Sequence, residues 1–175
     1  MRISTQGLDL IKTFEGLRLH AYMPTPIDVP TIGYGHTKTA KIGMKITERG
    51  AEELLKRDLA WVEKGVNKHV NVPLTQPQYD ALCSFVYNLG ATNFRRSTLL
   101  KRLNEGKYGE AANELLRWDK QGKKVLRGLT RRREAERALF VSKPSATKPA
   151  TPQGALAALI SSLIALLSAL LKNRS

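Results

Sequence analysis

The sequence predicts an α+β fold that is mostly helical, with a small β-containing region near its N-terminus. Two observations support this prediction. Most of the first 141 residues form segments whose apolar side chains recur three and four positions apart, as in helices that cover a core. Residues 22–46 lack that period and are rich in proline, glycine and β-branched residues, which favours loops and a small β-hairpin.

Capping residues mark where several of the helices begin. Thr47, Thr75 and Ser97 are the expected N-terminal caps, and Thr75 forms a capping-box pattern with Gln78. Residues 88–90 are typical of a helix end. The predicted helices are a short first one with its apolar face on Ile3, Leu8, Leu10, Ile11 and Phe14, and then 47–66, 76–89, 98–104, 108–118 and 130–141.

Composition divides the chain into three parts. We predict a folded domain over residues 1–141, a linker rich in proline, threonine and serine over 142–154, and an apolar helix over 155–172. Residues 155–171 consist only of Ala, Leu, Ile and Ser, with the large side chains at helical spacing. At about 1.5 Å per residue that helix is about 25 Å long, short of the roughly 30 Å hydrocarbon core of a bilayer.

The formal net charge of +14 indicates an anionic partner. Residues 1–141 hold 25 basic and 15 acidic side chains, whereas residues 142–175 hold four basic side chains and no acid. Nucleic acid, an acidic membrane surface and an acidic cell-wall polymer all fit this balance. The sequence contains no zinc-finger, RNA-binding aromatic or basic-zipper motif, which argues against nucleic acid.

Neither a metal nor a cofactor is predicted. Cys83 is the only cysteine, and we expect it to be a small buried apolar residue. His20, His36 and His69 have no spacing that would place two of them on one face of a helix as metal ligands.

Glu15 is a candidate general acid. It follows the apolar face of the first predicted helix, next to Phe14, and precedes Gly16. In a poorly solvated cleft, loss of hydration favours the protonated form of a carboxyl, which a general acid requires. Its position alone also fits a solvated surface glutamate.

Several spaced motifs resemble the phage-type lysozymes, glycoside hydrolase family 24. The resemblance covers about residues 1–141 and leaves the C-terminal tail outside. The stretches that carry it are FEGLRLHAY at 14–22, TIGYGHT at 31–37, PLTQPQYDAL at 73–82, FVYNLG at 85–90 and GLTRRREAER at 128–137. It implies a lysozyme-like fold, with a small N-terminal β-containing lobe, a larger helical lobe and a cleft between them.

The resemblance also implies an activity and site residues. The family hydrolyses the β-1,4 bond between N-acetylmuramic acid and N-acetylglucosamine in peptidoglycan. Its glutamate after the first helix matches Glu15 as general acid, and its threonine before Ile-Gly matches Thr31, which would help to hold the attacking water. Tyr34, His36 and Asn93 fall where we expect contact with substrate, although His36 also fits a hydrogen-bonded structural histidine and Asn93 fits a helix cap.

The sequence departs from the family pattern at the second carboxylate. The usual aspartate nine residues after the glutamate is replaced by Pro24, and Asp28 is the only acid in that loop. An inverting glycosidase needs two carboxyl groups roughly 6.5–9.5 Å apart. Asp28 is therefore a candidate catalytic residue if the loop folds back to the cleft, and otherwise an ordinary turn residue. With Glu15 alone, the chain would fit a lytic transglycosylase, in which the sugar's own 6-hydroxyl replaces water.

We predict core positions for Trp61 and Trp118. The arginines at 131–133 fit a solvated helix face, or a run held by Glu134 or by another acid.

The function that these features favour is that of a peptidoglycan muramidase used for bacterial cell lysis. A membrane-active antibacterial protein that works through residues 155–172 is the alternative. The chain has no apolar N-terminal signal, so we expect synthesis in the host cytoplasm and action on the cell wall. The expected partners are peptidoglycan and an anionic membrane, and we expect a monomer unless the tail associates with itself.

Overall fold

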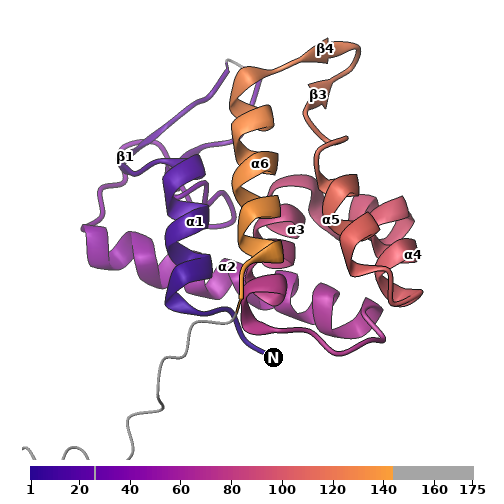
Figure 1. Ribbon diagram of the computed structural model, residues 1–175. Coiled ribbons are helices and arrows are strands. Elements are labelled where there is room, and N and C mark those ends of the chain that lie inside the picture. The colour runs from indigo at the N-terminus through magenta and orange to yellow at the C-terminus, as the bar shows by residue number, and fades with distance from the viewer. Residues whose placement is uncertain (26, 144–175) are drawn as a thin grey trace, which may run out of the picture. The chain divides into compact units, whose positions relative to one another are not determined.

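The computed structural model describes residues 1–25 and 27–143 (Figure 1). It confirms the mostly helical α+β prediction. The chain divides into a compact unit, Met1–Pro144, and a second unit, Ser145–Ser175. The predicted helix over 155–172 and the linker from residue 144 onward lie outside the described residues. The elements are α1 (Thr5–Glu15), β1 (Arg18–Tyr22), β2 (Thr31–Gly33), α2 (Glu48–His69), α3 (Gln76–Arg96), α4 (Thr98–Asn104), α5 (Tyr108–Leu115), β3 (Lys120–Gln121), β4 (Lys124–Val125) and α6 (Arg127–Val141).

Both ends of α1 are fixed by specific contacts. At the start, the Ser4 side chain accepts from the backbone N–H of Gly7, and the Ser4 backbone N–H donates to the buried carboxylate of Asp80 on α3 at 2.9 Å. At the end, Gly16 adopts φ 70°, and its N–H donates to the Lys12 carbonyl at 3.1 Å. Because that left-handed conformation strains other residues, glycine here ends the helix directly after Glu15.

The small lobe is built on one short antiparallel pair of strands. β1 pairs with β2 through Arg18 opposite Gly33 and Tyr22 opposite Thr31, with an irregularity between these two pairs. The β structure therefore begins at Arg18, before the predicted stretch of 22–46, because the chain turns directly from the end of α1 into β1.

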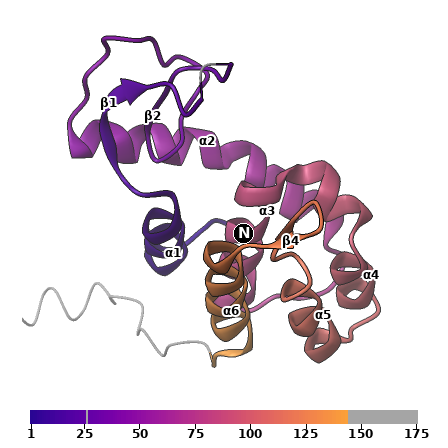
Figure 2. The same ribbon diagram turned by 90° about the horizontal axis from the view of Figure 1, so that it is seen from above.

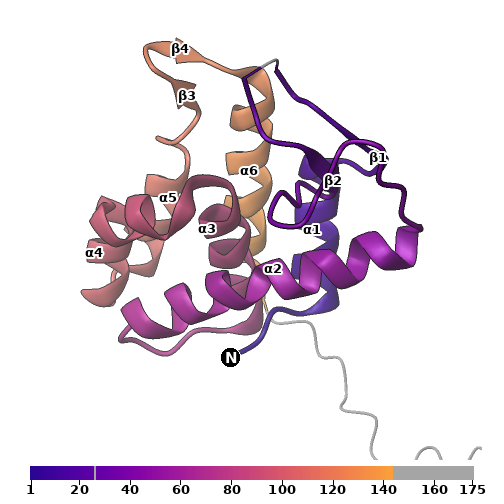
Figure 3. The same cartoon turned by 180° about the vertical axis from the view of Figure 1, so that it is seen from behind.

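Helix α2 connects the small lobe to the helical lobe. Thr47 caps its start, as predicted, and its 22 residues extend about 33 Å. Near its start, Ala51 packs against Gly33 of β2. Further along, α2 packs on α3 (Figures 2 and 3).

Helix α3 forms the centre of the helical lobe. It packs against α1, α2 and α6, and the predicted capping box of Thr75 and Gln78 is present at its start. Cys83 is completely buried in the apolar core, as expected. The predicted end at residues 88–90 is instead a kink, because the chain leaves helical geometry at Gly90 and then continues in further turns to Arg96.

Three other predicted boundaries are wrong. Helix α2 ends at His69, three residues after the predicted end. Helix α6 begins at Arg127, three residues before the predicted start, and α5 ends at Leu115, three residues before the predicted end. Between them lies the hairpin of β3 and β4, which the sequence did not predict. Each of its strands has two residues, too few to show a two-residue period.

Replacement of Gly7 tests the packing of α1 on α3. A Cβ atom at this position would lie 2.6 Å from Ile3 Cγ1 and 2.8 Å from Asp80 Cβ. We expect Gly7→Ala to lower the free energy of unfolding by about 2 kcal/mol, because overpacking outweighs the usual gain from alanine in a helix. Gly109→Ala in α5, where nothing lies within 4 Å, should raise it by roughly 0.5 kcal/mol. Denaturant unfolding of both variants measures this, and a stabilised Gly7→Ala would contradict the packing.

Candidate active site

A pocket of about 250 Å³ brings together side chains from both lobes. Glu15 comes from the end of α1, and the segment after β2 contributes three residues. Helix α2 adds Asp58 and Trp61, and α3 adds two residues just before its kink. The lining residues are Glu15, Gly35, Thr37, Lys38, Asp58, Trp61, Tyr87 and Asn88.

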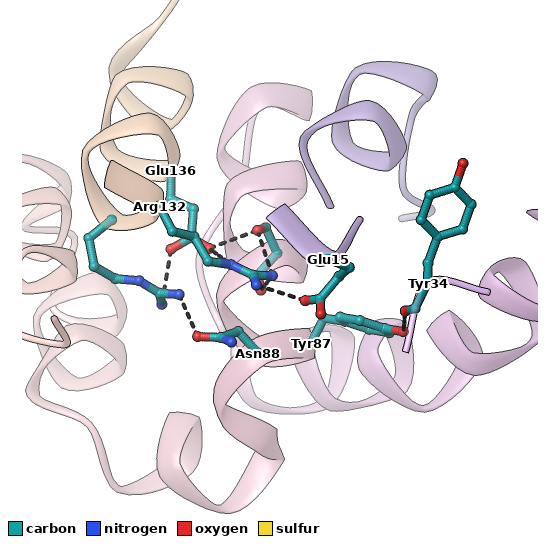
Figure 4. Close-up of polar contacts among 8 residues, drawn as sticks. Glu15, Tyr34, Tyr87, Asn88, Arg132 and Glu136 are labelled. Carbon is teal, nitrogen blue, oxygen red and sulfur yellow. Dashed lines mark hydrogen bonds and ion pairs between the residues drawn. The ribbon is translucent and has the colours of Figure 1, made fainter. Parts of the chain in front are cut away.

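Glu15 is held by an arginine from the last described helix. Helices α1 and α6 run antiparallel side by side, so the end of α1 lies beside the first turns of α6 (Figure 1). Arg132 Nη1 donates to Glu15 Oε1 at 2.7 Å (Figure 4). The Glu15 side chain is 21 % exposed and that of Arg132 only 4 %. The carboxyl thus faces the pocket on one side and a buried guanidinium on the other.

Behind this ion pair lies a buried cluster of charged groups. Arg132 Nε donates to Glu136 Oε1 at 3.2 Å, and Arg132 Nη2 donates to the Ser84 carbonyl at 3.2 Å. Arg133 Nη1 lies 3.0 Å from Glu136 Oε2, and its Nη2 donates to Asn88 Oδ1 at 2.7 Å. Ser84 Oγ donates to Glu136 Oε1 at 2.7 Å.

Burial acts against the charged form of two groups in this cluster. It raises the pKa of Glu136, while the two guanidinium groups and the Ser84 hydroxyl act in the opposite direction. Burial also lowers the pKa of Arg133, to about 10, so this arginine stays charged at neutral pH.

The prediction of a solvated arginine face is therefore wrong for two of the three arginines. Arg132 and Arg133 are buried, and only Arg131 is exposed. The alternative reading, that an acid holds the run, is correct, but the acids are Glu15 and Glu136. Glu134 is exposed.

Two aromatic rings form a wall of the pocket. Trp61 and Tyr87 stack with ring centroids 6.5 Å apart and an interplanar angle of 19°. Tyr87 Oη donates to the Tyr34 carbonyl at 2.8 Å. Burial, together with the negative charge of Glu15, raises the pKa of Tyr87, so its hydroxyl remains a donor at neutral pH. Trp61 is 37 % exposed, which corrects the prediction of a core position.

His36 is buried and bonded on both ring nitrogens. Its Nδ1 lies 2.7 Å from Asp58 Oδ2, and its Nε2 lies 2.8 Å from Thr39 Oγ1 and accepts from the Thr39 backbone N–H. These bonds tie the loop after β2 to α2. The geometry is that of the structural histidine, with no ring nitrogen left for a sugar.

Comparison with known proteins identifies the family of this chain. The model of the phage lysozyme family matches residues 12–136. The chain belongs to the phage lysozyme family. An endolysin of Acyrthosiphon pisum secondary endosymbiont phage 1 is 51 % identical over 146 residues, covering 81 % of this chain and 99 % of the relative. The endolysin of Salmonella phage P22 is 47 % identical over 147 residues, with the same coverage of each chain.

Solved structures give the same result. The muramidase domain of SpmX from Asticaccaulis excentricus has a TM-score of 0.77 at 43 % identity, covering 81 % of this lysozyme and 99 % of the domain. A P22 lysozyme variant has a TM-score of 0.75 at 45 % identity, covering 81 % and 99 %. The protein is a lysozyme-type glycosidase that degrades peptidoglycan, and it therefore acts on the cell wall.

Other predicted site residues of this lysozyme lie apart from the pocket-lining set. The Asp28 carboxylate is exposed and accepts from Thr25 Oγ1 at 2.8 Å, within a turn. The Thr31 hydroxyl donates to the Val29 carbonyl at 3.1 Å. Tyr34 is 6 % exposed and packs in the core, with its ring directed away from Glu15 (Figure 4). Asn93 donates to the Leu89 carbonyl at 2.7 Å, as a helix-capping side chain does.

The sequence interpretation missed several residues around Glu15. Arg132, Tyr87, Asn88 and Lys38 were not singled out as site residues, and no local pattern separates them from core or surface positions. Glu136 follows Arg132 by four residues, the spacing of a helical ion pair, but this spacing is also common on solvated helix faces and does not identify a site residue.

Over residues 1–25 and 27–143, no three His, Cys, Asp or Glu side chains cluster in a way that could hold a metal ion. Over the same residues, no helix has both the length and the apolar character needed to cross a membrane.

Proposed function

We propose that Glu15 is the general acid of this lysozyme and protonates the glycosidic oxygen of the β-1,4 bond between N-acetylmuramic acid and N-acetylglucosamine. The main support for this proposal is that Glu15 is held at a fixed place in the pocket. It is the last residue of a capped helix, and one of its oxygens is bonded to a buried arginine. A catalytic group must be held in position before substrate binds, and this one is.

The two oxygens of Glu15 face different surroundings. Oε1 accepts from Arg132, so a proton on this oxygen would oppose the guanidinium. Oε2 lies toward Gly35, where an added Cβ atom would be 3.7 Å from it. The proton for the leaving group is therefore carried on Oε2, because glycine leaves space there for a sugar to approach.

The remaining pocket residues suit a glycan. The stacked pair of Trp61 and Tyr87 offers an apolar face to a sugar ring, while Asn88 and Lys38 offer polar hydrogens. A cleft with an aromatic wall and a few polar groups holds a sugar by its face and its hydroxyls.

Replacement of Glu15 tests the general-acid role. We expect Glu15→Gln to keep the fold and to lose activity on soluble peptidoglycan fragments by about 10³-fold, because the amide has no proton of suitable acidity to give. Glu53→Gln, an exposed glutamate on α2, is the matched control and should keep wild-type activity. Activity of Glu15→Gln within tenfold of the parent would remove Glu15 from the mechanism.

Replacement of Asp28 tests whether the loop supplies a second carboxylate. Because its carboxylate is bonded to Thr25 in an exposed turn, we expect Asp28→Asn to keep activity within about threefold. We expect products with a reducing muramic acid end, as hydrolysis gives. A loss as large as that of Glu15→Gln would make Asp28 the second carboxylate of an inverting pair. Anhydro ends would instead show transglycosylation.

We further propose that the basic tail contacts an anionic membrane while the body binds the wall. Residues 142–175 contain four basic side chains and no acid, beside an apolar stretch. The body has its own basic surface around the β3–β4 hairpin. Within the described residues no carboxylate oxygen lies within 4.0 Å of the charged nitrogens of Lys120, Lys123 and Lys124.

Truncation separates the two contacts. We expect a chain that ends at Pro144, the limit of the first compact unit, to bind purified peptidoglycan as the full chain does. Its binding to vesicles that contain anionic lipid should fall by roughly tenfold, because the tail's charges and apolar residues are gone. Co-sedimentation measures both. Equal vesicle binding by the two chains would contradict a membrane role for the tail.

A further inference from the structure

Arg132 is shared between two carboxylates. Its Nη1 donates to Glu15 at 2.7 Å, and its Nε donates to Glu136 at 3.2 Å (Figure 4). Glu136 is fully buried and has a second cation beside it, Arg133, with Nη1 at 3.0 Å from Oε2. Two carboxyl groups and two guanidinium groups thus alternate from the pocket into the core.

As far as the structure describes the chain, the cluster leaves buried polar atoms without hydrogen bonds, so it is not well suited to a purely stabilising role. Arg133 Nη1 and Glu136 Oε2 lie close but make no hydrogen bond, and within the described residues Arg133 Nε has no hydrogen-bond partner either. Buried ionic groups of this kind contribute little net stability compared with apolar residues of the same size. A cluster retained for packing alone would not need these unsatisfied atoms.

We propose that Glu136 is a positioning residue that competes with Glu15 for Arg132 and so keeps Glu15 able to hold its proton. This inference rests on the proposed role of Glu15 as general acid. A cation in contact with a carboxyl favours its ionised form and works against a general acid. The negative charge of Glu136 offsets part of the electrostatic effect of Arg132 on Glu15, while the positive charge of Arg133 offsets part of that of Glu136.

Removal of the Glu136 charge and removal of the Arg133 charge should move the pH at which Glu15 loses its proton in opposite directions. Without the charge of Glu136, Arg132 has only Glu15 as carboxylate partner, and the proton is lost at lower pH. Without Arg133, Glu136 depends on Arg132 alone and draws it away from Glu15, which then keeps its proton to higher pH.

Other groups that face Glu15 stay the same in such variants. Asp58 on α2, Tyr87 on α3 and Lys38 in the loop after β2 line the same pocket, and Lys12 is the basic residue of the last turn of α1. None of these four residues bonds to Glu136 or Arg133, as far as the described residues go. The side chain of Asn88, which also lines the pocket, loses its bond from Arg133 in Arg133→Met, but its amide carries no titratable group. A change in pH dependence can therefore be assigned to the charges of the cluster formed by Arg132, Arg133 and Glu136.

The test is the pH profile of kcat/KM on soluble peptidoglycan fragments at constant ionic strength. We expect the alkaline limb of Glu136→Gln to move to lower pH by roughly one unit, and that of Arg133→Met to move to higher pH. Glu136→Asp keeps the charge and should restore the limb to within half a unit of the parent. A folded fraction that stays constant with pH scales the whole profile and leaves the position of the limb unchanged, and circular dichroism over the same pH range checks that it is constant.

A charge removed from the exposed side of α6 serves as the matched control. Glu134→Gln removes the same charge from the exposed side of α6 and should leave the limb in place. If Glu136→Gln yields no folded protein, Arg133→Met alone tests whether Arg132 is shared between Glu15 and Glu136. In that case the alkaline limb should move to higher pH. Unmoved limbs in both variants, or limbs that move in the same direction, would overturn the inference. Activity of Glu15→Gln near that of the parent would instead overturn the proposed function beneath it.

Discussion

The contact between Arg132 and Glu15 joins the first helix of the chain to the last described one, across 117 positions of sequence. For the two side chains to meet, α1 must end directly at Glu15, and α6 must run back beside it. Gly16 satisfies the first condition through its left-handed backbone, and the packing of both helices on α3 satisfies the second. The small lobe then begins two residues later, so the same contact also determines where the pocket opens.

The buried charges around this contact illustrate a balance between stability and function. Arg133 and Glu136 are completely buried, although burial disfavours the charged form of both. Replacement of buried ion pairs by well-packed apolar side chains of similar volume is often neutral or stabilising in proteins. Arg132 donates to Glu136 and to the Ser84 carbonyl through the nitrogens that do not face Glu15. Apolar residues could not make these bonds and so could not hold Arg132 at a defined place behind Glu15. The cluster is therefore best explained by the orientation of one side chain.

The pocket gains its second property, an aromatic wall, from α2 and α3. Trp61 and Tyr87 belong to helices that pack side by side, and their rings stack where the small lobe meets those helices. His36 and Asp58 hold the loop after β2 against α2. Gly35 in that loop lies beside Glu15, so the contact between His36 and Asp58 helps to determine the shape of the pocket.

The sequence predicted most of the helical framework because its signals are local. The caps at Thr47, Thr75 and Ser97 are all present, since a cap depends only on residues three positions away. The place of Glu15 before Gly16 made it only a candidate, and the family resemblance favoured it over a surface glutamate. Arg132 could not be recognised, because three consecutive arginines resemble a solvated face until the partner acids from α1 and α6 are known. Trp61 was misplaced for a similar reason, since helical spacing does not distinguish a core ring from one that lines a pocket.

The most direct test of the account is a crystal structure of Glu15→Gln bound to a peptidoglycan tetrasaccharide. The account predicts the glycosidic oxygen within about 3 Å of the side chain at position 15, on the side of Gly35, with Arg132 still bonded to the other side-chain atom. A sugar ring should lie against Trp61 and Tyr87. A glycan bound with its scissile bond away from position 15, or an Arg132 turned away from it, would contradict the account.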